Sequence, residues 1–201
     1  STNLVAGQAE GNASNDVFIY DRDRGESTLV SRAAGSSTLT GNKRSDAISI
    51  SSDGRWSLYY TQANNVVAGT TGTGFENAYL FDLDTGLATL VSYSGAPTQT
   101  VGLGLYKLLS MSADGRFVSW NTNSSVISGI THQNNGDDVY LFDRQSGGNT
   151  LISRSASSPM STGNGESKPI AISADGSGIL YYSEARDLVS GVTDSNHSKD
   201  V

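Results

Sequence analysis

Three segments of the sequence place oxygen-bearing side chains at a spacing that suits a metal ion. They are Glu10-x-Asn12-x-x-x-Asp16, His132-x-Asn134-x-x-x-Asp138 and Asp194-x-Asn196-x-x-x-Asp200. Ca²⁺ is a hard cation that takes about six to eight oxygen ligands, which carboxylates and amide oxygens supply. We therefore predict Ca²⁺ as the cofactor. The predicted metal ligands are Asp194, Asn196, Asp200, Glu10, Asn12, Asp16, Asn134, Asp137 and Asp138.

The three segments differ in how well they suit Ca²⁺. Imidazole is a poor ligand for this ion, so the His132 segment is the weakest candidate, although Asp137 adds a carboxylate. The same positions in the middle of the chain are Thr71, Thr73 and Asn77, in a loop one residue shorter. That loop has no carboxylate at these positions, and we expect it not to bind. Asn and Asp also build turns by hydrogen bonding to backbone amides, which is the alternative role for every segment.

Residues for catalysis are scarce. The chain has two histidines, His132 and His197, both in polar loops. It lacks a Gly-x-Ser-x-Gly elbow, a His-Glu-x-x-His zinc motif and a glycine-rich phosphate loop. We predict no catalytic residue and no bound organic cofactor, and therefore that the chain is not an enzyme.

The elements that must position these loops recur every 61 residues. Asp21, Asp82 and Asp143 are one such set, and Gly25, Gly86 and Gly147 are a second. A third is the Ser-x-Asp-Gly signature that contains Asp53, Asp114 and Asp175. Several sets in phase indicate an internal repeat rather than chance.

Each repeat predicts four short antiparallel strands. The first alternates apolar and polar residues, as in Ala47–Ser51, and Asp-Gly then makes a tight turn. An aromatic-rich second strand such as Trp56–Tyr60 follows, and a long loop leads to the third, such as Asp138–Asp143. A turn closing on Gly gives the fourth. We interpret the repeated aspartates as turn formers and the strand aromatics as packing between neighbouring units.

Four-stranded repeats of this kind are typical of β-propeller blades. The signatures resemble the TolB-like family, also described as WD40-like or PD40 repeats, over nearly the whole chain. The resemblance implies the fold strongly and the function weakly. One departure is that the family usually has Pro before the turn Asp, where this chain has Ser52, Ala113 or Ala174. The blades are also longer than usual for the family, which implies elaborated loops.

The predicted architecture is one all-β propeller domain over 1–201 with about three blades of material. Strands three and four of a first blade lie in 1–32, whole blades in 46–93 and 107–154, and a partial blade in 168–201. Propellers usually have about four to eight blades. Either the chain is a fragment of a longer propeller, which we favour, or a second copy completes a six-bladed ring.

The amino-acid composition and net charge of the chain exclude some classes of binding partner. The net charge of −7 and the pI near 4.6 argue against nucleic acid and anionic membranes. No apolar run reaches the length that spans a bilayer, so we expect no membrane insertion. The chain has no cysteine, and its Ser-, Thr- and Asn-rich composition favours an exported protein: periplasmic, cell-surface or secreted.

The sequence thus predicts a non-catalytic binding or scaffolding module for a protein or glycan partner, stabilised by Ca²⁺. Binding is expected on the long-loop side of the blades, because binding residues concentrate in loops on rigid scaffolds. The alternative is the propeller domain of a larger enzyme, such as a peptidase. A polysaccharide lyase is a further alternative, since the resemblance includes propellers that are lyases with a His-ligated metal.

Overall fold

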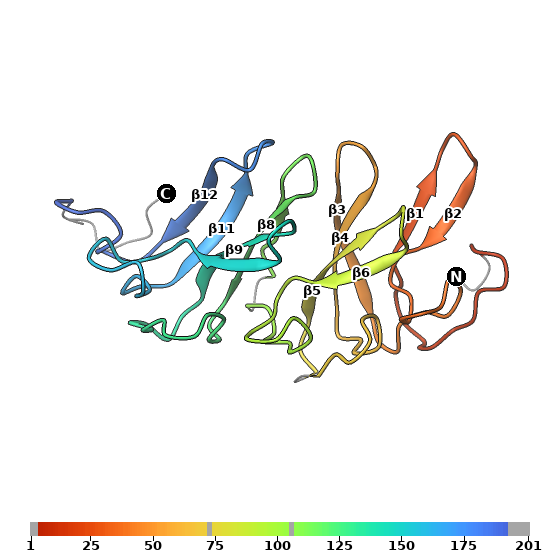
Figure 1. Ribbon diagram of the computed structural model, residues 1–201, viewed down its shortest axis with the longest axis horizontal. Helices are drawn as coiled ribbons and strands as arrows, with labels where there is room; N and C mark the ends of the chain where they lie inside the picture. Colours follow the sequence, from red (N-terminus) through yellow and green to blue (C-terminus); the bar gives the residue numbers. More distant parts are fainter. Residues whose placement is uncertain (1–3, 72–73, 105–106, 193–201) are drawn as a thin grey trace. The chain divides into compact units, whose positions relative to one another are not determined.

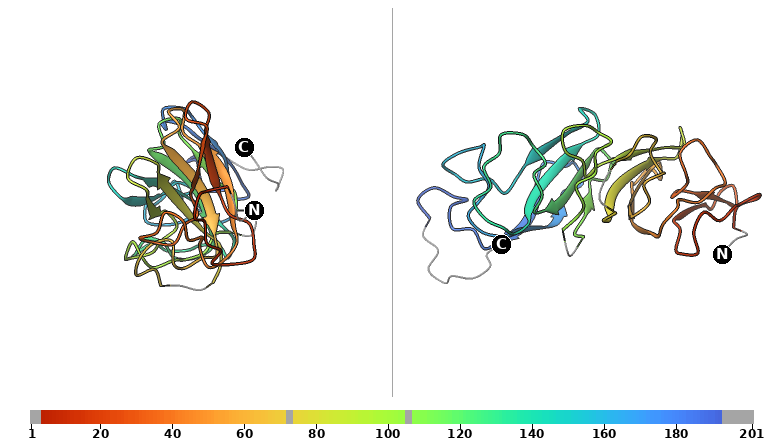
Figure 2. Two further views of the ribbon diagram at one scale, coloured as in Figure 1. Left: turned by 90° about the vertical axis from the view of Figure 1, so that its right-hand side faces the viewer. Right: turned by 90° about the horizontal axis from the view of Figure 1, so that it is seen from below.

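The computed structural model describes residues 4–71, 74–104 and 107–192 (Figure 1). Every regular element in these ranges is a β-strand, and no helix covers a sheet in any view of them (Figures 1 and 2). None of the described segments is therefore a helix of the length and apolarity needed to cross a membrane. The strands are β1 (Phe18–Asp21), β2 (Glu26–Leu29), β3 (Ser45–Ile50), β4 (Trp56–Thr61), β5 (Asn77–Asp82), β6 (Leu87–Leu90), β7 (Ser110–Met111), β8 (Phe117–Thr122), β9 (Asp138–Asp143), β10 (Gly148–Leu151), β11 (Ser167–Ile172) and β12 (Ile179–Ser183).

The strands form antiparallel sheets in two compact units, Ser1–Gly102 and Leu103–Val201. The first unit holds the two-stranded sheet β1-β2 and the four-stranded sheet β3-β4-β5-β6. The second holds the four-stranded sheet β7-β8-β9-β10 and the two-stranded sheet β11-β12. The all-β class and the four-stranded blades of a partial propeller are as the repeat predicts. The sequence predicted one domain over 1–201, and the division into units falls between the second and third predicted blades.

The tight turns are built by the side chains of the Ser-x-Asp-Gly signature. Asp53 Oδ1 accepts hydrogen bonds from Ser51 Oγ (2.5 Å) and from the backbone N–H of Arg55 (3.0 Å). Gly54 has a φ of +75°, which a residue with a Cβ rarely adopts. The hydrogen bond from Ser51 is the main reason that the pKa of Asp53 lies below its ordinary value. The prediction that these aspartates form turns is confirmed.

A pair of aromatic side chains lies in the core of each four-stranded sheet, and in the second sheet the pair is Trp120 and Tyr140. Tyr59 and Tyr79 face each other across β4 and β5 with ring centroids 5.7 Å apart. Val17 and Val30, from the first blade, join the same buried cluster, so the two sheets of the first unit pack together. In the second unit β11 packs against β7, β8 and β9. The predicted packing between neighbouring blades is therefore present inside each unit.

The long loops of the four-stranded sheet in the first unit meet at one end. Because neighbouring strands are antiparallel, the start of β3, the end of β4 and the start of β5 share that end. The β3–β4 turn lies at the opposite end, at the top of Figure 1, and the loops run along the bottom. Side chains from three separate loops are thus brought together.

Candidate functional site

A pocket of about 160 Å³ opens among these loops, at the end of the β3-β4-β5-β6 sheet. It lies between the segment before β3, the segment after β4 and the segment before β5. Most of its lining residues are of polar types, including four with amide side chains, and one is aromatic. The lining residues are Asn42, Lys43, Gln62, Ala63, Asn64, Thr70, Gly74, Phe75, Asn77 and Thr100.

The buried amide of Asn77 fixes the position of Phe75. Asn77 Nδ2 donates to the Phe75 carbonyl oxygen (2.8 Å), while Asn77 Oδ1 accepts from the Gly102 N–H (2.9 Å) and from Ser92 Oγ (3.1 Å). Gly102 has a φ of +81°, and a Cβ there would lie 3.1 Å from the Phe75 Cβ. The backbone is therefore held tightly on both sides of a side chain that is itself 62% exposed.

The polar rim of the pocket is partly prearranged. Asn42 Nδ2 donates to Asn64 Oδ1 (2.8 Å), and the Asn64 N–H donates back to Asn42 Oδ1 (3.3 Å). Lys43 contributes the one charged group in the lining. The arrangement offers an apolar ring face beside several groups that can both donate and accept hydrogen bonds.

The first predicted metal segment forms a hydrogen-bonded loop closure. Asn12 Nδ2 donates to the Gly41 carbonyl oxygen (2.5 Å) and lies 3.4 Å from Asp16 Oδ1. Ser31 Oγ also donates to Asp16 Oδ1 (3.3 Å). Glu10 is exposed and accepts from Gln8 Nε2 (2.9 Å). Asn12 and Asp16 thus come together, with the amide nitrogen directed at the carboxylate.

The second segment repeats this arrangement before β9. Asn134 Nδ2 donates to the Gly163 carbonyl oxygen (2.7 Å) and lies 3.4 Å from Asp138 Oδ1. Asp137 is separate from this group, because its Oδ2 accepts from Asn121 Nδ2 (2.7 Å). Asn134 and Asp138 are therefore brought together, and Asp137 is not.

The third segment, with Asp194, Asn196 and Asp200, lies outside the described residues. Within residues 4–71, 74–104 and 107–192, no three His, Asp or Glu side chains gather closely enough to hold a metal ion. The Ca²⁺ sites stay a prediction.

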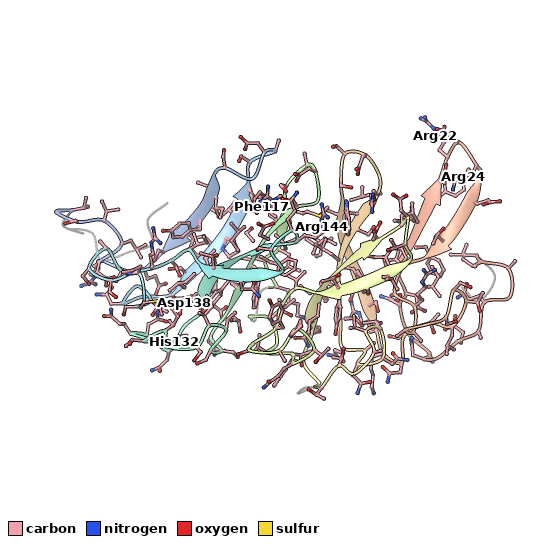
Figure 3. The ribbon with its side chains drawn as sticks, viewed as in Figure 1. Arg22, Arg24, Phe117, His132, Asp138 and Arg144 are labelled. Carbon is pink, nitrogen blue, oxygen red and sulfur yellow. The ribbon has the colours of Figure 1, made fainter. Side chains whose placement is uncertain are left out.

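Asp138 is the most strongly perturbed carboxyl group of the second unit. Its side chain is fully buried, and burial raises its pKa to about 6 despite hydrogen bonds from Asn134 and Ser153 that favour the ionised form. His132 Nδ1 lies 3.5 Å from Asp138 Oδ2, a separation that suits an ion pair (Figure 3). Asp138 Oδ2 accepts no well-aligned hydrogen bond from the described residues.

The other nitrogen of His132 faces a serine. Ser125 Oγ lies 3.3 Å from His132 Nε2, and Ser125 is exposed. The order is therefore serine, Nε2, Nδ1 and carboxylate, running from solvent to the interior. This is the connectivity of a Ser-His-Asp triad, with contacts longer than the roughly 2.6–3.2 Å of well-aligned catalytic hydrogen bonds. Sequence reasoning missed this array because no elbow motif surrounds Ser125.

Two bidentate ion pairs were also missed. Arg55 Nε and Nη2 each lie 2.8 Å from the carboxylate of Asp82, and Arg116 binds Asp143 in the same way at 3.0 Å. The first pair joins the β3–β4 turn to the end of β5, and the second joins the β7–β8 turn to the end of β9. The available signal was an Arg directly after Ser-x-Asp-Gly in both whole blades.

Comparison with known proteins gives a distant structural similarity. No family model matches the chain, and no curated protein matches it. Among solved structures the chain is similar to TolB from Acinetobacter baumannii, with 16% identity and a TM-score of 0.47. The match covers 92% of this chain and 36% of that chain, so this chain spans about a third of that protein's length. At this score the similarity carries no argument about function.

Proposed function

We propose that this chain is a non-catalytic binding module of a β-propeller, which binds a protein or glycan partner through its long loops. The observation that carries the proposal is the pocket around Phe75. Phe75 presents a ring that is 62% exposed at the edge of the pocket, on a backbone held by the buried Asn77, so the ring is positioned to contact a ligand in the pocket.

The chemistry of the lining also supports binding. Ligand sites combine apolar and aromatic walls with a few placed polar groups, and this pocket joins Phe75 and Ala63 to the amides of Gln62 and Asn64. Its volume of about 160 Å³ is smaller than the roughly 300–1,000 Å³ typical of drug-sized ligands. It therefore suits one ring or one side chain of a larger partner.

A fragment screen by ligand-observed NMR tests the proposal. Small cyclic compounds at millimolar concentration should bind the chain, and Phe75→Ala should abolish the signal of those that use the pocket. Tyr20→Ala is the matched control, because Tyr20 is 64% exposed and lies outside the lining. A screen whose hits all persist in Phe75→Ala would contradict the proposal.

Two finer features belong to the same proposal. The composition, rich in uncharged Ser, Thr and Asn, supports an exported location, which cell fractionation with an antibody against the chain would check. Ca²⁺ would bind near Asp16 and Asp138 and near the segment that contains Asp194. Further blades of the same protein, or a second copy, would complete the ring.

The Ser125, His132 and Asp138 array favours an enzyme as the second candidate function. In an acyl transfer, Ser125 Oγ would bond to the acyl carbon while His132 Nε2 takes its proton and returns it to the departing alcohol or amine. The ionised Asp138 would stabilise the imidazolium. This is hydrolase chemistry, as in a peptidase, and the array offers nothing specific to a polysaccharide lyase.

Labelling with a fluorophosphonate separates the two functions. An activated serine attacks phosphorus and releases fluoride, so the intact chain would gain the mass of the phosphonyl group on Ser125. Ser125→Ala is the variant that must lose the label, and Ser124→Ala is the matched control. We expect no labelling if the chain is only a binding module.

A further inference from the structure

We infer that the pocket around Phe75 takes one saccharide unit of a glycan, and that it takes a carboxylated sugar more tightly than a neutral one. The inference rests on the binding function proposed above and adds the class of ligand. It follows from three features of the lining: the ring, the amides and the single charge.

The Phe75 ring supplies the apolar contact. One face of a pyranose ring carries mostly C–H groups, which are weakly positive, whereas the face of an aromatic ring is weakly negative. A sugar can therefore lie flat on Phe75, with the hydroxyl groups directed outward from the ring edge. A Cβ at position 102 would lie 3.5 Å from Phe75 Cγ, so Gly102 leaves the space that the base of the Phe75 ring needs.

The amides match the hydroxyl groups. Each sugar hydroxyl both donates and accepts hydrogen bonds, and so does each Asn or Gln side chain. Asn42 and Asn64 are already locked to each other, and Gln62 lies beside them on the same rim. Prearranged groups lose less conformational freedom when they bind, which offsets part of the entropic cost of association.

Lys43 determines the preference for a charged sugar. The lining has no acidic side chain to neutralise the ammonium group of Lys43, although the whole chain has a net charge of −7. The positive charge of Lys43 therefore attracts a carboxylated sugar at the pocket. Because Lys43 is exposed, this attraction is worth little, and we expect a preference of about two- to fivefold at low salt.

Calorimetry with tetrasaccharides of glucose, N-acetylglucosamine and glucuronic acid tests the inference. We expect the glucuronic acid probe to bind best, Phe75→Ala to weaken it about tenfold, and Phe75→Trp to preserve it. Gln62→Ala should weaken all probes about two- to tenfold. Lys43→Gln should bring the acidic and neutral probes to equal affinity. Tyr20→Ala should change nothing, and melting curves would verify that each variant is folded.

The possible outcomes distinguish the saccharide inference from the proposed binding function on which it rests. If fragments bind in a Phe75-dependent way and no saccharide does, the binding function holds and the saccharide class is overturned. If saccharides bind equally well to wild type and Phe75→Ala, the site is wrong. Equal affinity of acidic and neutral probes for the wild type would overturn the role of Lys43.

Discussion

The loop ends of the two whole blades differ at one buried position, Asn77 in the first unit and Asp138 in the second. The contacts of this position with a serine on the neighbouring strand end are alike in the two blades. Ser92 Oγ donates to Asn77 (3.1 Å) and Ser153 Oγ donates to Asp138 (3.2 Å). Each serine oxygen also accepts the N–H that follows the variable residue, at 3.0 Å in both blades. We call these two contacts of the serine, with the variable side chain and with the next backbone N–H, the serine clasp. The clasp is present in both whole blades, and the residue at the variable position determines the other contacts of the loop.

The exchange of amide for carboxylate reverses the direction of one hydrogen bond. The amide of Asn77 donates to the Phe75 carbonyl oxygen and holds that residue at the rim of a pocket. The carboxylate of Asp138 can only accept while it is ionised, and it lies beside the amide nitrogen of Asn134. One blade therefore presents an aromatic ring, and the other closes its loop with Asn134.

The strongest test of this difference between Asn77 and Asp138 is the substitution Asn77→Asp. The carboxylate oxygen that replaces Nδ2 would oppose the Phe75 carbonyl oxygen and would lack a donor, although Gly102 and Ser92 still donate to the other oxygen. This should lower the free energy of unfolding by about 2–4 kcal/mol. Denaturant unfolding at pH 7 measures the loss. The loss should shrink at acidic pH, where a protonated carboxyl group can donate again.

The reciprocal change is the control for that experiment. Asp138→Asn keeps an oxygen for Ser153 and Asn134 and removes a buried charge, so it should cost less than about 1 kcal/mol at pH 7. Equal losses from Asn77→Asp and Asp138→Asn would show that the two positions do not differ as described.

The second prediction concerns pH in the second unit. Burial raises the pKa of Asp138 to about 6, so the folded chain binds a proton that the unfolded chain has released between about pH 4 and pH 6. The stability contributed by Asp138 is therefore greatest near pH 4 and falls as the pH rises to about 6. We expect the free energy of unfolding of wild type, relative to Asp138→Asn, to fall by about 2–3 kcal/mol from pH 4 to pH 7.

Trp120 can report this transition. The chain has two tryptophans, Trp56 in the first unit and Trp120 in the second, so a Trp56→Phe background isolates the second unit. The interaction with His132 lowers the pKa of Asp138, so His132→Asn should enlarge the pH effect. A pH-independent difference between wild type and Asp138→Asn would contradict the prediction.

The sequence predicted the features that depend on neighbours along the chain. The Ser51, Asp53 and Gly54 turn is made by residues within five positions of each other, so the motif contains its own contacts. The spacing of 61 residues then placed the strands. The first strands were less accurate: β3 spans Ser45–Ile50 instead of the predicted Ala47–Ser51, and its pairing with β4 shifts register between Ala47 and Ser49, which a strict alternation of apolar and polar residues does not show.

The candidate sites depend on contacts between distant residues, and the sequence could not show them. The pocket joins Asn42, Gln62 and Phe75, which only the antiparallel register of β3, β4 and β5 brings to one end. The sequence did contain one signal of the pocket. Phe75 stands where the neighbouring repeats have Ser14 and Gly136, and a large apolar residue in a polar loop marks a departure from the repeat.

The third prediction tests the serine contact that the two whole blades have in common, made by Ser92 and Ser153. Ser92→Ala and Ser153→Ala each leave a buried backbone N–H without its acceptor and should lower the free energy of unfolding by about 1–2 kcal/mol. The two losses should agree within about 0.5 kcal/mol, as expected for equivalent contacts in different sheets. Ser128→Ala, in the loop after β8, is a serine control with little expected effect, because Ser128 is exposed. A large difference between Ser92→Ala and Ser153→Ala would mean that the clasp is not equivalent in the two blades.

The smallest expected effect is that of Ca²⁺, which would distinguish blades with a carboxylate from the blade with Asn77. Weak sites with a dissociation constant of about 1 mM would add about 1 kcal/mol at 5 mM Ca²⁺. The melting temperature should therefore rise slightly with Ca²⁺ and fall with EDTA. Mg²⁺ at the same ionic strength should have less effect, because it demands a stricter geometry.

Variants locate the effect of Ca²⁺. Asp16→Asn and Asp200→Asn should each remove part of the rise in melting temperature, whereas Thr71→Ala in the middle blade should leave it unchanged. To bind the ion near Asp16, the Asn12 amide would have to turn its oxygen toward the carboxylate and give up its hydrogen bond to Gly41. Because of that cost, we expect the affinity for Ca²⁺ to be weak. Identical melting curves in Ca²⁺ and in EDTA would mean that these loops are held by hydrogen bonds alone.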